Sequence, residues 1–124
     1  MKAKGEIINL KQRTKEFALR IIRLYSSLPK TTEAQIIGKQ ILRSGTSVGA
    51  HYREAKRARS KAEFISKIRG GQQELEEKIY WIELLSESGI VARPKLESLF
   101  QESKELTAIF ITCVKNAKFK STLK

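Results

Sequence analysis

Apolar residues recur at helical spacing through most of this chain, and only three short stretches interrupt the pattern. The 124 residues are enough for one modest core, so we expect a single domain spanning residues 1–124. Four amphipathic segments with short connections predict an all-α fold, an antiparallel up-down-up-down four-helix bundle. We place the helices at about residues 6–28, 33–59, 61–88 and 94–115, followed by a basic C-terminal tail at residues 116–124.

The interruptions contain residue types that end or begin helices. Proline cannot continue a helix, serine or threonine followed by glutamate or glutamine marks a helix start, and glycine often follows a helix end. A proline is also well tolerated in the first turn of a helix. The residues that give these signals are Pro29, Thr32 with Gln35, Ser60 with Glu63, Ser88 with Gly89, and Pro94.

The second predicted helix carries an apolar face and an opposite basic face. At about 100° per residue, Ile37, Ile41, Ser44, Val48, Tyr52 and Ala55 share one side. Cationic side chains on the other side are candidates for binding the phosphates of nucleic acid, and small residues between them leave room for a phosphate to approach. These candidates are Lys39, Arg43, Arg53 and Arg57, extended by Lys56 and Arg59.

Three glycines, Gly38, Gly45 and Gly49, flank the basic line of this helix. A glycine inside a helix costs about 0.5–1 kcal/mol relative to alanine, so something must approach closely there. One explanation is tight packing between helices of the bundle, and the other is a subunit contact or a ligand surface. We group Gly45 and Gly49 with Trp81 and Leu85 as candidates for oligomer contacts or close packing, because the third predicted helix is apolar over more than one stripe.

The third predicted helix also contains the pair Gly70 and Gly71. Gly71 lies in the buried line of this helix, which predicts that a neighbouring helix crosses closely at that point. The alternative is a break in the helix at the glycine pair.

The charge of the chain is unevenly distributed. The formal net charge is +12, of which residues 1–59 contribute +10 and residues 115–124 contribute +4, whereas residues 60–114 contribute −2. A basic half beside a slightly acidic half favours contact with nucleic acid, RNA or DNA, or with another polyanion. The alternative is a basic surface that serves solubility alone.

The chain lacks the residue patterns of catalytic and metal sites. His51 is the only histidine and Cys113 the only cysteine, so we expect no metal, no cofactor and no disulfide. The cluster of Glu74, Glu76 and Glu77 is explained more simply by ion pairs or a solvated face than by acid–base catalysis. We therefore predict that the protein is not an enzyme. No apolar run approaches the length of a membrane span, and we expect the cytoplasm as its location.

The sequence around the basic line resembles the 23S rRNA-intervening sequence proteins. The resemblance lies in residues 42–50, 52–55 and 57–65, and the later residues 74–77 and 80–85 match in type and spacing. It covers nearly the whole chain. One departure is His51, where the family commonly has asparagine.

The resemblance implies a bacterial four-helix bundle that often assembles as a pentamer. Members are encoded within intervening sequences of large-subunit rRNA genes or elsewhere on the chromosome. The family is similar to the accessory protein of diversity-generating retroelements, a basic pentamer that binds nucleic acid and a reverse transcriptase.

Two hypotheses about function follow. The first is a non-catalytic homo-oligomer that binds nucleic acid through phosphate contacts. The second is a scaffold whose partner is an acidic protein or a polymerase-like enzyme. Retention of a partner after nuclease treatment would distinguish the second hypothesis from the first.

Overall fold

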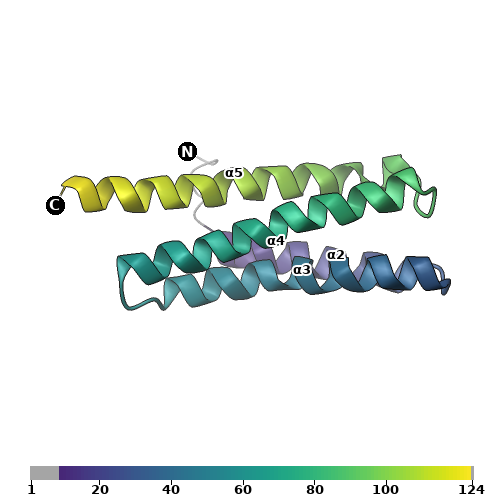
Figure 1. Ribbon diagram of the computed structural model, residues 1–124, viewed down its shortest axis with the longest axis horizontal. Helices are drawn as coiled ribbons and strands as arrows, with labels where there is room; N and C mark the ends of the chain where they lie inside the picture. The colour runs from purple at the N-terminus through teal and green to yellow at the C-terminus, as the bar shows by residue number, and fades with distance from the viewer. Residues whose placement is uncertain (1–8, 124) are drawn as a thin grey trace.

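The structure is a computed structural model that describes the backbone of residues 9–123 and the side chains of residues 9–119. Its four helices are α2 (Leu10–Ser27), α3 (Thr32–Lys56), α4 (Lys61–Glu87) and α5 (Arg93–Leu123), and residues 9–123 contain no strand. Consecutive helices run in opposite directions along the long axis (Figure 1). The all-α four-helix bundle predicted from the sequence is confirmed. No helix of this described part is long and apolar enough to cross a membrane.

Several helix ends form as the turn residues predict. The Ser60 side chain accepts a hydrogen bond from the backbone N–H of Glu63 at 3.1 Å, which caps α4. α4 ends at Glu87, and Gly89 adopts a φ of +80°, a conformation that glycine takes without strain. α2 ends at Ser27, before Pro29. Local chemistry therefore determines these boundaries.

Other boundaries differ from the sequence expectation. The N-cap of α3 is Thr31 rather than Thr32, because the Thr31 side chain accepts a hydrogen bond from the Ala34 N–H at 3.3 Å. α3 ends at Lys56, so Arg57 caps the helix and Arg59 lies in the turn that follows. The segment 116–124 was expected to be a tail, yet α5 continues to Leu123. No glycine or proline follows Pro94, so nothing in the sequence stops this helix. Residues 6–8 of the first predicted helix lie outside the described residues.

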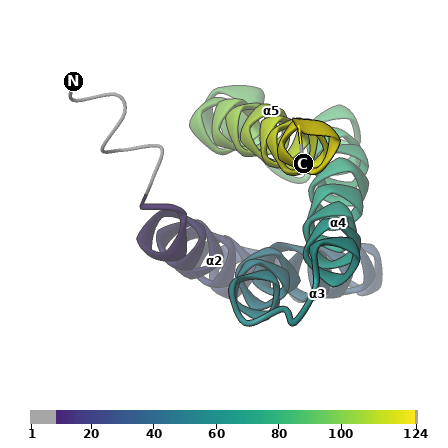
Figure 2. The same cartoon turned by 90° about the vertical axis from the view of Figure 1, so that its left-hand side faces the viewer.

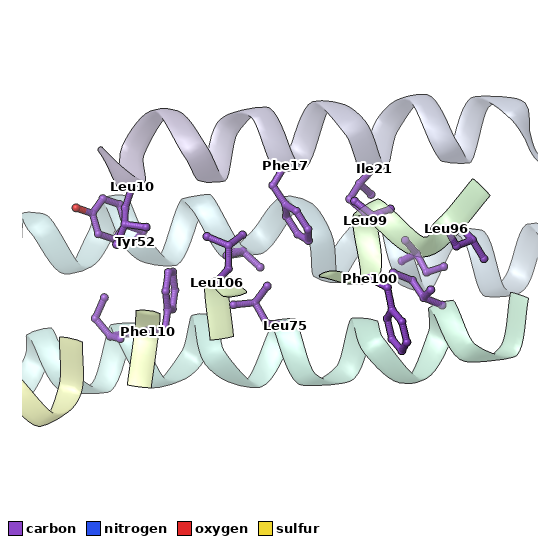
Figure 3. Packing of buried hydrophobic residues seen from close by; sticks show 14 of the residues in the cluster. Leu10, Phe17, Ile21, Tyr52, Leu75, Leu96, Leu99, Phe100, Leu106 and Phe110 are labelled. Atoms are coloured by element: carbon purple, nitrogen blue, oxygen red, sulfur yellow. The ribbon is translucent and has the colours of Figure 1, made fainter. Parts of the chain in front are cut away.

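The helices follow one another around the core, and the side between α2 and α5 is the most open (Figure 2). Their inward faces contribute large apolar side chains to one continuous core (Figure 3). The most deeply buried of these are Phe17, Ile21, Ile41, Val48, Ile68, Leu75, Ile82, Leu85, Leu106 and Phe110.

Glycines let α2 and α3 approach each other closely. A Cβ atom at Gly45 would lie 2.7 Å from a side-chain carbon of Ile21, and one at Gly49 would lie 3.2 Å from the Thr14 hydroxyl oxygen. Gly45 and Gly49 are both buried against α2. Of the two explanations for these glycines, close packing inside the bundle is therefore the one that the structure supports.

Glycines also bring other helices close to α4, which runs unbroken through Gly70 and Gly71. A Cβ atom at Gly71 would lie 2.5 Å from Phe110 of α5, and one at Gly70 would lie 2.8 Å from the ring of His51 on α3. The expected close crossing at Gly71 is thus present, and the alternative of a helix break is wrong.

Polar contacts close the side between α2 and α5. Arg13 of α2 donates to both carboxylate oxygens of Glu102 at 2.8 Å and to Glu105 at 2.7 Å. These contacts raise the pKa of Arg13, chiefly through the Glu102 hydrogen bond. Further along α2, Arg20 donates a hydrogen bond to the Ser98 hydroxyl of α5 at 2.8 Å. Ion pairs and hydrogen bonds thus join this pair of helices, which approach each other less closely than consecutive helices do.

Lys78 of α4 is fully buried beneath this side of the bundle. Its ammonium donates to the Ser103 hydroxyl and lies 4.3 Å from the centre of the Phe17 ring. Burial lowers the pKa of Lys78 to about 7, with a further decrease from Arg20 and an opposing increase from Glu102. A lysine in such a position destabilises the fold whenever the unfolded chain would be protonated.

Replacing Gly45 with valine should destabilise the bundle by about 1–3 kcal/mol, because the new side chain would overlap Ile21. Chemical denaturation followed by circular dichroism would measure the change. Ala50→Val is the matched control, since Ala50 is exposed on the same helix. Equal effects of the two substitutions would show that Gly45 is not packed as described.

Replacing Lys78 with methionine should stabilise the protein by about 1–3 kcal/mol at neutral pH, because a buried charge is removed and the volume is nearly kept. The pKa of Lys78 is about 7 in the folded state against an ordinary 10.5. The unfolded chain therefore binds more protons between these values, so wild-type stability gains from rising pH. The advantage of Lys78→Met should shrink from pH 7 to pH 10 in denaturation curves. Lys115→Met, at an exposed position, should show no such trend.

Candidate nucleic-acid interface

The cations predicted to form one basic line fall into two groups along α3. Lys39 and Arg43 lie in the first half of the helix, and Arg53 and Lys56 lie in its last turn. Ten residues of helix separate Arg43 from Arg53, which corresponds to about 15 Å. The two groups therefore differ in their surroundings and are considered separately.

Arg43 is already engaged by two glutamates of α4. Its guanidinium donates to Glu77 at 2.8 Å and to Glu74 at 3.4 Å. The Glu77 hydrogen bond is the main cause of the raised pKa of Arg43. Arg43 was predicted to present its charge to a phosphate, whereas in the structure two carboxylates already balance that charge. We therefore leave Arg43 out of the candidate interface.

The same glutamates explain the acidic cluster seen in the sequence. Glu77 also accepts a hydrogen bond from the indole N–H of Trp81 at 3.2 Å. The pKa of Glu77 is lowered first by this bond and then by Arg43. Glu74 and Glu77 thus act as ion-pair partners between α3 and α4, as one of the two simpler sequence interpretations proposed. Because Arg43 is half exposed, each pair adds little stability.

A second group of cations gathers where α3 ends. Arg53 and Lys56 are favourable in the last turn of α3, because helix carbonyl groups concentrate negative charge there. None of the cations in this region forms an ion pair with an acid among the residues whose side chains are described. We name this region the basic end and define it as Lys11, Arg53, Lys56, Arg57, Arg59 and Lys61.

Lys11 and Lys61 were not among the residues predicted from the sequence. The contact between Thr14 and Gly49 sets the register of α2 against α3, and Lys11 lies one turn before Thr14. This register brings Lys11 beside the last turn of α3. The glycine spacing on α3 could have indicated the position of Lys11, but only if the glycines had been known to face α2.

The basic end contains two hollows. The first, of about 360 Å³, is lined by Lys11, Tyr52, Arg53, Lys56 and Arg57, and we name it the basic hollow. The second, of about 520 Å³, lies between the α3–α4 turn and α5, and its lining includes Arg59, Lys61, Phe64 and Cys113. Burial raises the pKa of the Cys113 thiol, with a smaller opposing effect of Lys56. Cys113 is therefore a protonated thiol, as expected for a partly buried cysteine.

The remaining sequence candidates do not join the basic end. Leu85 is fully buried in the core, and Gly45 and Gly49 face α2. Trp81 is half-buried in the second half of α4, with the exposed Tyr80 ring 5.1 Å away in an edge-on arrangement. The structure therefore separates the candidates into core residues, the distant Trp81, the basic end, and Lys39 and the ion-paired Arg43 in the first half of α3.

His51 is a packing residue in the structure. Its ring lies against Gly70, and its Nε2 is 3.9 Å from a carboxylate oxygen of Glu74. Its Nδ1 has no hydrogen-bond partner among the described residues. Within the same part of the chain, no group of three or more His, Cys, Asp or Glu side chains is placed to hold a metal ion.

Comparisons with known proteins found one matching family and a similar crystal structure. A family profile described as 23S rRNA-intervening sequence protein matches residues 6–112. A crystal structure from Bacteroides thetaiotaomicron, described as a protein of unknown function from the S23 ribosomal protein family, is 41% identical with a TM-score of 0.80. That match covers 85% of this chain and 97% of the other. No curated protein matches this chain in sequence.

The profile match spans most of the sequence and includes every residue of the basic end. The helices that it covers are those of the bundle described above, and the similar crystal structure shares this fold. The chain therefore belongs to the family of 23S rRNA-intervening sequence proteins.

Proposed function

We propose that this protein is a non-catalytic, oligomeric nucleic-acid-binding protein of the cytoplasm that contacts phosphates through its basic end. The observation that carries the proposal is a cluster of six cations at one end of the bundle, none of which pairs with an acid among the described residues. A surface of this kind attracts polyanions from a distance and neutralises phosphates on contact.

The distribution of the glutamates supports this choice of surface. Glu74 and Glu77 neutralise Arg43, and Glu102 and Glu105 neutralise Arg13, so neither pair of glutamates contacts a cation of the basic end. Glu54, on the last two turns of α3, contacts Lys67 of α4 at 3.1 Å. Glu63 lies near the α3–α4 turn, but its carboxylate accepts from the backbone N–H of Arg59 at 3.1 Å and forms no ion pair with the cations of the basic end. The positive charge of the basic end therefore exceeds the negative charge beside it.

Two features favour weak sequence selectivity. Phosphate contacts fix the position of a nucleic acid but do not read its bases. The basic end consists of lysine and arginine side chains, which suit phosphates of any sequence. The family descriptions refer to rRNA and to ribosomal protein, which favours RNA over DNA as the ligand.

Self-association would repeat the basic end within one assembly and raise its affinity for a long polyanion. An apolar patch suited to this role lies on α3 and α4, where Ile36 is 57% and Tyr80 54% exposed. Ile36 lies two turns before Arg43 and Leu84 two turns after Glu77, so the antiparallel register places them at one level. We define the apolar patch as Ile36, Tyr80, Trp81 and Leu84, and the family resemblance favours a pentamer.

Reversing two charges of the basic end, with Arg53→Glu and Arg57→Glu together, should weaken RNA binding by about tenfold or more at low salt. The slope of the logarithm of affinity against the logarithm of salt concentration should become shallower by about two, because two phosphate contacts are lost. Fluorescence anisotropy at several salt concentrations measures both. The matched control is Lys30→Glu with Lys95→Glu, which changes the net charge equally at exposed positions away from the basic end.

Equal loss of binding in both double variants would show that net charge alone governs association. No binding by the wild-type protein at low salt would remove the proposal. Co-purification of a protein partner that survives nuclease treatment would favour the scaffold hypothesis instead.

Placing charge in the apolar patch, with Ile36→Glu and Tyr80→Glu, should reduce the molar mass measured by light scattering at micromolar concentration. Phe119→Glu is the control, because Phe119 is 63% exposed outside this patch. A monomeric wild-type protein would contradict the oligomer, and an unchanged mass in the double variant would exclude the patch as the contact.

A further inference from the structure

The basic hollow combines four cations with the hydroxyl of one tyrosine. Lys11 reaches it from α2, while Arg53 and Lys56 come from the last turn of α3 and Arg57 from its cap. No acidic residue lines it. Its volume of about 360 Å³ lies in the range of small-ligand pockets.

Tyr52 is anchored in the core and turns its hydroxyl to the hollow. Only 7% of the residue is exposed, and its ring centre lies 6.3 Å from that of Phe110. Figure 3 shows the hydroxyl oxygen directed away from Phe110 and the other buried side chains. No hydrogen bond within the described residues involves this hydroxyl. The hydroxyl oxygen is not among the buried polar atoms that lack a partner, so it is open to the solvent of the hollow and can donate to a ligand there.

The chemistry of this hydroxyl specifies an acceptor. Burial is the main cause of the raised pKa of Tyr52, so the phenol keeps its proton at neutral pH and acts as a donor. The four cations are donors as well, and none of them accepts hydrogen bonds. The hollow therefore offers only donors from its side chains and suits an anion with several acceptor oxygens.

We propose that the basic hollow binds the terminal phosphate monoester of a nucleic-acid strand. This inference rests on the proposed function and names the group that the basic end selects. A phosphodiester inside a strand carries a single charge. A terminal phosphate carries a charge of about −1.5 to −2 at pH 7 and presents three acceptor oxygens. Four convergent cations and a fixed hydroxyl match the terminal group better than the internal one.

The position of the hollow is consistent with a strand end. The hollow lies at one end of the bundle, and the other cations of the basic end, Arg59 and Lys61, lie in the adjacent turn and at the start of α4. A strand whose last phosphate occupies the hollow can place its next phosphates against these cations. Affinity then comes from the whole basic end, and preference for a phosphorylated end comes from the hollow.

The experiment compares short single-stranded RNAs of one sequence that differ only at their ends. One pair carries a 5′-phosphate or a 5′-hydroxyl, and another carries a 3′-phosphate or a 3′-hydroxyl, with the label on the opposite end. Fluorescence anisotropy of the full-length protein at constant salt measures each affinity. We expect a terminal phosphate on at least one end to strengthen binding by about tenfold.

Two variants locate the effect. Tyr52→Phe keeps the ring in the core and removes only the hydroxyl, so it should reduce the preference for a phosphorylated end by about fivefold. Lys11→Gln, at an exposed position that does not threaten folding, should change the preference in the same direction. In both variants, the affinity for hydroxyl-ended RNA should change less than the affinity for phosphorylated RNA. Lys30→Gln, at an exposed position outside the basic end, should leave the preference intact.

The outcomes separate this inference from the proposed function. Equal affinity for phosphorylated and hydroxyl-ended RNA would overturn the terminal-phosphate site and leave general nucleic-acid binding standing. A preference that survives in both Tyr52→Phe and Lys11→Gln would also overturn it, because the phosphate would then bind elsewhere. Absence of binding to every RNA would remove both proposals.

Discussion

The close approach of α2 and α3 determines much of the rest of the molecule. Gly45 and Gly49 leave room for Ile21 and Thr14, so the two helices meet in one register. That register buries Tyr52 and places Lys11 beside the last turn of α3. A Cβ atom at Gly45 would overlap Ile21 and one at Gly49 would crowd Thr14, so larger residues at these positions would disturb the register that places Lys11 beside α3. The basic hollow is therefore a product of helix packing as well as of charge.

Charge is distributed in the bundle by pairing as much as by composition. Arg13 and Arg43 belong to the basic half of the sequence, yet each meets two glutamates across a helix interface. The cations at the end of α3 find no such partners within the described residues, since Glu54 contacts Lys67 instead. A sum over the sequence cannot distinguish these cases, because neutralisation depends on which helices become neighbours.

Much of the fold was predictable from local signals, whereas the site was predictable only in part. Ser60 begins α4 and Gly89 follows its end through their own local chemistry, so both ends of this helix could be predicted from the sequence. Thr31 and Thr32 offer the same hydroxyl, and only the backbone conformation decides between them. Arg43 was predicted to bind phosphate because of the helix face on which it lies, but that face does not show that glutamates of α4 pair with it. Lys11 was missed because its proximity to α3 is a tertiary contact.

The placement of Tyr52 links the surface of the protein to its interior. One end of the side chain packs against Phe110 of α5, and the other borders the basic hollow. A ligand held by the hydroxyl would therefore act on a ring that joins α3 to α5. If such a ligand binds the folded chain more tightly than the unfolded chain, the difference in binding free energy adds to the free energy of unfolding of the whole bundle. A ligand bound in the surface hollow would therefore, through Tyr52, also stabilise the packing of α5, although α5 does not line the hollow.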